Sequence, residues 1–131
     1  MTPTLTLVIY MAILTWLTLL AASLIRAKGW TPAGMMIAFG NRDNLPDATA
    51  LAGRAARTAQ NTLEGFLLFA AIALVAHAAG VASPRVALGA QVFFWARVVY
   101  IPVYYAGIVY LRTAVWTVGI IGLAMMISAM L

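Results

Sequence analysis

Four polar residues recur at helical spacing inside a chain that is otherwise apolar. Residues 53–65 read GRAARTAQNTLEG, although the whole chain is 65% hydrophobic and only 8% charged. At about 100° per residue, the side chains of Arg54, Arg57, Asn61 and Glu64 fall on one helix face less than a quarter-turn wide. Arginines and an amide on one face suit an oriented, hydrogen-bonded anion.

A second polar row follows on the next apolar segment. Arg97, Tyr100 and Tyr104 share one helix face by the same count, and the short turn between the two segments makes them antiparallel. Glu64 and Arg97 then lie at similar depths, roughly 18 and 20 Å from the same membrane face at 1.5 Å per residue. A lone charge at mid-bilayer is costly, so we expect a Glu64–Arg97 ion pair, which could also serve only to hold the helices together.

The same count predicts two further pairs of residues at equal depth on the two helices, nearer the membrane face. Asn61 is level with Tyr100, and Arg57 is level with Tyr104. Near that face the cations outnumber the one carboxylate of the row. The surplus basic residues are Arg26, Lys28, Arg54, Arg57 and Arg112.

Arginines at helix ends often extend to lipid headgroups, and this reading is favoured for Arg26 and Arg54. For Arg57 and Arg112, headgroup contact and a bound anion remain equal alternatives. Tyr100 and Tyr104 could equally be packing residues.

The elements that position these residues are transmembrane helices. A chain of 131 residues with this composition is unlike a soluble domain, and a span needs about 20 apolar residues. We expect an all-α membrane protein, a four-helix bundle forming one domain over residues 1–131. The expected spans are 4–25, 48–79, 84–110 and 113–131, with Asp47 capping the second.

Composition narrows the chemistry further. The chain has no cysteine, which excludes disulfides, thiolate metal sites and a thiol nucleophile of its own. One histidine, His77, argues against a metal site in one chain, so we expect no metal. The net charge of +5 forms no basic stripe, so membrane lipid or an anionic small molecule, not nucleic acid, is the expected partner.

Basic residues indicate the orientation, because they favour the cytoplasmic side. With four spans, only Arg85 falls at the face opposite the other basic residues. We therefore expect a multi-pass protein with both termini outside the cytoplasm. The long connector after the first span contains GMMIAF, which is consistent with a segment along the membrane surface or with a plain connector.

The two spaced rows resemble a known family. Arg54-x-x-Arg57-x-x-x-Asn61-x-x-Glu64 on the second span and Arg97-x-x-Tyr100-x-x-x-Tyr104 on the third are similar to the MAPEG family, membrane-associated proteins in eicosanoid and glutathione metabolism. The likeness covers nearly the whole chain and is greatest to uncharacterised bacterial members, which implies the bacterial inner membrane. It also implies a homotrimer that binds glutathione between subunits near the cytoplasmic face.

The resemblance assigns roles to particular residues. It implies that the glutathione-contacting residues are Arg57, Asn61, Glu64, Tyr100 and Tyr104, with Arg97 bracing Glu64. It also implies that Arg112 stabilises the glutathione thiolate and that Arg26 or Lys28 reaches the site from a neighbouring first helix. The implied activity is a glutathione-dependent transferase or peroxidase acting on a lipophilic small molecule.

Two departures from the family pattern keep an alternative open. Ala59 stands where relatives have His or Gln, and Gly65 stands where an aromatic residue is common. These favour a non-enzymatic membrane protein of the same fold that holds a lipid headgroup or another anion in the basic cleft. A small transporter is a third reading, but the polar row fades toward the outer face and offers no continuous path.

Overall fold

The chain folds into helices only. The computed structural model describes residues 1–131. The helices are α1 (Pro3–Ala27), α2 (Pro32–Phe39), α3 (Ala50–Ala78), α4 (Pro84–Tyr105) and α5 (Val109–Ser128). All except α2 are long and apolar enough to cross a membrane. The predicted all-α chain with four spans is therefore confirmed.

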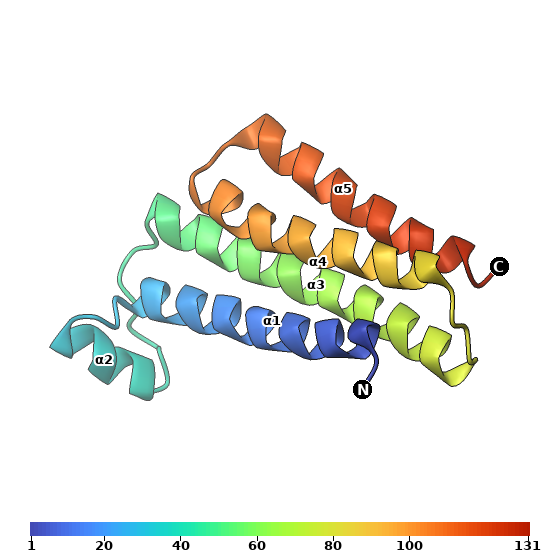
Figure 1. The fold of residues 1–131 in the computed structure, drawn as a ribbon. Helices are drawn as coiled ribbons and strands as arrows, with labels where there is room; N and C mark the ends of the chain where they lie inside the picture. The colour runs from blue at the N-terminus through green and yellow to red at the C-terminus, as the bar shows by residue number, and fades with distance from the viewer.

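The four long helices alternate in direction along the chain. Figure 1 shows both termini at one end of the bundle and α2 at the opposite end, which we call the α2 end. The end of α4 and the starts of α3 and α5 meet at the α2 end. Helix α5 packs mainly on α4 and not on α1, so it forms one edge of the bundle.

The connector after α1 is more ordered than a plain loop. Its GMMIAF run lies within α2. This helix begins at Pro32 and is capped by Thr31, whose hydroxyl accepts a hydrogen bond from the backbone N–H of Gly34. Arg42 donates to the hydroxyl of Ser23 at 2.7 Å and to its carbonyl at 3.1 Å. These bonds attach the connector to the end of α1.

Three expected helix boundaries were wrong. Helix α3 is capped by Thr49, whose hydroxyl accepts from Ala52, and not by Asp47, because the helix begins at Ala50. The third span ends at Tyr105 instead of residue 110, since Gly107 takes a left-handed φ of 75° that breaks the helix. Helix α5 therefore starts at Val109, and Arg112 lies in its first turn instead of in a loop.

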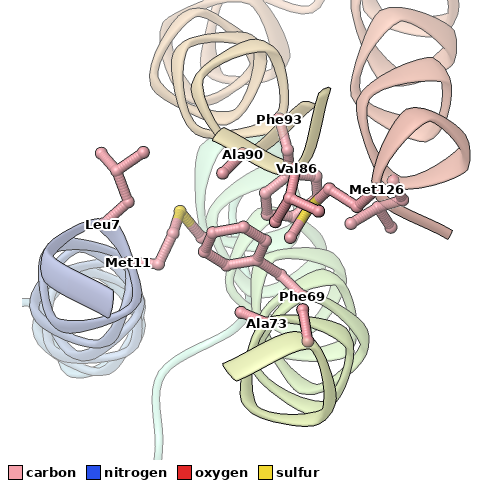
Figure 2. Close-up of a cluster of buried hydrophobic side chains, with 10 residues drawn as sticks. Leu7, Met11, Phe69, Ala73, Val86, Ala90, Phe93 and Met126 are labelled. Atoms are coloured by element: carbon pink, nitrogen blue, oxygen red, sulfur yellow. The ribbon is translucent and has the colours of Figure 1, made fainter. Parts of the chain in front are cut away.

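The apolar core lies away from the α2 end. Figure 2 shows side chains from all four long helices meeting there, and the Phe69 and Phe93 rings stack with centroids 4.8 Å apart. The labelled members are Leu7, Met11, Phe69, Ala73, Val86, Ala90, Phe93 and Met126. This core fixes α3 against α4 and leaves their other halves for polar residues.

Helices α4 and α5 approach most closely where two glycines face each other. A Cβ added to Gly89 would lie 2.5 Å from the carbonyl oxygen of Gly122, and one added to Gly122 would lie 2.7 Å from that of Gly89. The two small residues Gly119 and Gly122 in the last span predict close helix approach, which the structure confirms at Gly122 but not at Gly119, and the partner Gly89 was not predicted. Such contacts are common where small residues let membrane helices pack.

Gly122→Ala is expected to lower the free energy of unfolding by about 1–3 kcal/mol, because the helices must separate to admit the methyl group. Gly119→Ala is the matched control: its Cβ would meet Ala96 and Phe93 at 3.7 Å, an ordinary contact. Unfolding in mixed micelles, followed by circular dichroism, measures both. Equal stabilities of the two variants would contradict the close approach.

Candidate functional site

A polar pocket opens near the α2 end between α3, α4 and α5. Its volume is about 280 Å³. The lining residues are Arg57, Gln60, Asn61, Glu64, Tyr100, Tyr104 and Arg112. We call this site the polar pocket. It gathers every residue predicted to contact glutathione from these three helices, and it adds Gln60, which was missed.

The sequence of α3 explains why these side chains turn toward the pocket. The buried stripe of this helix consists of small residues: Ala52, Ala55, Thr58, Ala59 and Thr62. Arg57 and Glu64 lie about 140° and 160° around the helix from Thr62. They therefore project from the exposed side of α3, nearly opposite its buried stripe, instead of into its contact with the rest of the bundle.

Helix α4 supplies the buried side of the pocket. Tyr100 and Tyr104 are both buried, and their rings meet edge to face with centroids 5.5 Å apart. Arg57 donates a hydrogen bond from Nε to the Tyr104 hydroxyl at 3.1 Å. The predicted pairing of Arg57 with Tyr104 is therefore confirmed.

Arg112 closes the pocket from the first turn of α5. Its guanidinium carbon lies 4.6 Å from the centre of the Tyr104 ring, a cation–π arrangement. Arg57 and Arg112 thus contact the same tyrosine from two different helices. The pocket has two guanidinium groups and one carboxylate, and Glu64 is the only acidic residue in any of the five helices.

The predicted Glu64–Arg97 ion pair was wrong. Arg97 donates from Nη1 to the Asn61 amide oxygen at 2.7 Å and from Nη2 to the Thr62 hydroxyl at 2.9 Å. Glu64 is exposed and accepts a hydrogen bond from Gln60 at 3.0 Å. Depth alone suggested the pair, but Glu64 projects from the exposed side of α3, whereas Arg97 bonds to Thr62 of its buried stripe.

Arg97 therefore carries a positive charge that no carboxylate neutralises. Its side chain is 3% exposed, its guanidinium carbon lies 4.1 Å from the centre of the Tyr100 ring, and its Nε has no hydrogen-bond partner. Asn61 connects this buried cation to the polar pocket, because it lines the pocket and accepts from Arg97.

The remaining basic residues of the α2 end lie outside the polar pocket of their own chain. Arg54 donates to the Tyr105 carbonyl at 2.9 Å, which ties α3 to the end of α4. Arg26 donates to the Pro46 carbonyl. Lys28 caps the C-terminal end of α1 in a left-handed conformation, with φ of 54°.

The geometry favours an anionic ligand that carries one cationic group. Guanidinium groups bind carboxylates through paired, charge-assisted hydrogen bonds. Glu64 offers the matching acceptor for an ammonium group. The tyrosines and Asn61 supply neutral partners that fix the orientation of such a ligand.

Comparison with known proteins gives one result. Searches of curated proteins and of solved structures found no match. The sequence model of the MAPEG family matches residues 3–131, nearly the entire chain. With four spans and the spaced polar rows on α3 and α4, the chain belongs to the MAPEG family.

Proposed function

We propose that this protein is a glutathione-dependent membrane transferase or peroxidase that acts on a lipophilic small molecule. The observation that carries the proposal is the polar pocket, which joins two guanidinium groups, one carboxylate and two tyrosines. Family membership supports it, since the MAPEG family includes glutathione transferases and peroxidases.

Glutathione matches the pocket in charge. It carries two carboxylates, one ammonium group and one thiol. In the proposed complex, Arg57 binds a carboxylate, Glu64 binds the ammonium group, and Asn61, Tyr100 and Tyr104 fix the peptide by hydrogen bonds and packing. Arg97 acts indirectly, because it holds the Asn61 amide oxygen.

Arg112 is the proposed catalytic residue. A free thiol has a pKa of about 8.5 and is mostly protonated at neutral pH. A guanidinium beside the bound sulfur favours the thiolate and so lowers the pKa of the thiol. The thiolate then needs no nucleophile from the protein, which agrees with a chain that has no cysteine.

Two reactions can start from this thiolate. In a transfer, the sulfur attacks an electrophilic carbon and forms an S–C bond, and the leaving group takes the electron pair. In peroxide reduction, the sulfur attacks a hydroperoxide oxygen, the O–O bond breaks, and an alcohol leaves after proton uptake. The resulting sulfenic acid reacts with a second glutathione to give the disulfide and water.

We propose that the assembly is a homotrimer with the pocket at the subunit interface. The supporting observation is that Gln60 and Glu64 are exposed on a spanning helix. Polar groups facing lipid are costly, so a second subunit is the favoured neighbour. In such an interface, Arg26 or Lys28 of a neighbouring α1 would complete the basic pocket. We place the α2 end at the cytoplasmic face of a bacterial inner membrane, with both termini outside.

A second candidate function is non-enzymatic binding of a lipid headgroup or another anion in the same pocket. Two observations favour it: Arg57 is exposed, as a headgroup contact would be, and Ala59 is buried against the bundle where the resemblance leads one to expect a polar residue. Calorimetric titration separates this reading from glutathione binding.

Arg57→Met is expected to weaken glutathione binding at least about tenfold, since a hydrogen bond to a charged group contributes about 1.5–3 kcal/mol. Titration of the detergent-solubilised protein with glutathione and with phosphatidylglycerol measures both ligands. Arg85→Met is the matched control, because Arg85 is exposed at the opposite end of the bundle beside Ser128. Parent protein that binds the phospholipid but no glutathione would contradict the proposal and support the second candidate.

A further inference from the structure

Helix α2 has no polar side chain, yet only one side of it is covered by the protein. Its sequence is PAGMMIAF. It contacts α1 and no other helix, and Figure 1 shows it beyond the C-terminal end of α1, on the side away from α5. A helix that is hydrophobic all round is normally buried. The uncovered side of α2 therefore needs an apolar neighbour that the single chain does not supply.

The covered side of α2 is held tightly against the end of α1. Gly34 is buried there, and a Cβ added to it would overlap the carbonyl oxygens of Ala27 and Lys28. The Thr31 hydroxyl donates to the Lys28 carbonyl at 2.9 Å. These contacts fix the rotation of α2 about its own axis, so its opposite side points away from the protein.

The opposite side of α2 is a continuous apolar surface. At about 100° per residue, Pro32, Met35, Met36 and Phe39 lie within roughly 100° of one another around the helix. All four are exposed, Met36 at 78% and Phe39 at 84%. Trp30, which is 68% exposed, lies in the turn before the helix. We call these five side chains the α2 face.

The length of α1 places the α2 face at a membrane boundary. The 25 residues of α1 extend over roughly 37 Å, whereas the hydrocarbon core of a bilayer is about 30 Å thick. The end of α1 therefore reaches the lipid headgroups, and only four residues separate it from Pro32. Tryptophan is enriched at this level of a membrane, which agrees with the position of Trp30.

The charge beside the α2 face is positive. Lys28 is exposed in the same turn as Trp30. Residues 26–54 contain four basic and two acidic side chains. The cytoplasmic leaflet, where we place the α2 end, has a negative surface potential that attracts such segments. An apolar face bordered by positive charge is thus complementary to a layer of anionic phospholipid.

A second copy of the chain fits the α2 face less well than lipid does. Stable protein interfaces bury about 800 Å² on each partner. Helix α2 has eight residues and is therefore about 12 Å long, and it has α1 as its only neighbour. A surface of this size is too small to hold two subunits together by itself.

We propose that α2 is an interfacial membrane anchor. The α2 face inserts into the leaflet at the α2 end, and Lys28 contacts the phosphate groups of anionic phospholipids around it. The anchor holds the connector between α1 and α3 on the membrane surface. The inference does not rest on the proposed glutathione function, because it uses no residue of the polar pocket.

Tryptophan fluorescence of the protein in lipid vesicles tests the anchor. One reporter protein keeps Trp30 and has the other three tryptophans replaced by phenylalanine. A second has all four replaced and carries Phe39→Trp. Phospholipids brominated on the acyl chains should quench both reporters, and acrylamide in the water should quench them weakly. Asn44→Trp, at an exposed position of the connector beyond α2, is the matched control and should show the reverse.

Charge selectivity is measured with the Trp30 reporter by comparing brominated phosphatidylglycerol with brominated phosphatidylcholine at equal mole fraction. The anionic lipid should quench more strongly. Lys28→Gln should lower its relative association constant by about threefold or more at low salt, as expected for one basic residue at a lipid surface. Arg85→Gln, at the opposite end of the bundle, is the matched control and should leave the constant unchanged.

Two results would overturn the anchor. Reporters that acrylamide quenches strongly and brominated lipid does not would show that the α2 face lies in water. Reporters that neither quencher reaches would show that protein covers it. Equal quenching by the two lipids would overturn the contact between Lys28 and anionic headgroups. No glutathione is present in these measurements, so their failure is distinct from failure of the proposed function.

Discussion

Arg112→Ala is expected to abolish the ultraviolet absorbance of bound glutathione thiolate and to lower kcat by about 10²-fold or more. Removing one fixed group that stabilises developing or existing negative charge has an effect of this order. The structure places Arg112 in the first turn of α5, where its guanidinium lies over Tyr104 and lines the polar pocket. Difference spectra and single-turnover kinetics measure the two effects.

The Arg112 prediction requires that glutathione still binds to the variant. Arg57 and Glu64 remain in place, so affinity should fall less than kcat. Arg85→Ala controls for loss of one arginine, since Arg85 lies at the start of α4, at the opposite end of the bundle from Arg112. A variant that keeps full thiolate absorbance would show that another group activates the sulfur.

Asn61→Leu is expected to lower the free energy of unfolding by about 2–3 kcal/mol. The substitution removes one of the two acceptors of the buried Arg97 guanidinium, the Asn61 amide oxygen at 2.7 Å, and leaves only the Thr62 hydroxyl; a hydrogen bond to a charged group contributes about this much. Glu64→Gln should change the stability by less than about 0.5 kcal/mol, because Glu64 is exposed and bonds only to Gln60. Denaturant titration in mixed micelles measures both variants.

A double-mutant cycle sharpens this second prediction. Adding Arg97→Met to Asn61→Leu removes the uncompensated charge, so the double variant should be more stable than Asn61→Leu alone. The changes in the free energy of unfolding caused by Arg97→Met and by Glu64→Gln should instead be additive. Strong energetic coupling between Glu64 and Arg97 would indicate that the two residues form an ion pair and would contradict the structure.

The sequence was sufficient to predict the four spans and the gathering of the polar residues. Apolar runs of spanning length set the helices, and the 100° rotation per residue placed Arg57 opposite Tyr104. Gln60 could have been found in the same way, because it lies one turn before Glu64. These are features of single helices or of one antiparallel pair.

Features that depend on how helices rotate against each other could not be predicted. The partner of Arg97 was missed because depth specifies the level of a residue and not the flank from which it projects. The contact between Gly89 and Gly122 involves two separate helices, α4 and α5. The end of α4 was misplaced because the residues around Gly107 are uniformly apolar.

The most direct test of the central claim is a pH titration of glutathione bound to the parent protein, followed by thiolate absorbance. The positive pocket around Arg112 should lower the pKa of the bound thiol by at least about one unit from its free value near 8.5. Since the charged form is favoured, thiolate should persist at neutral pH and disappear only on further acidification. Bound glutathione that titrates like free glutathione, or no binding at all, would contradict the account.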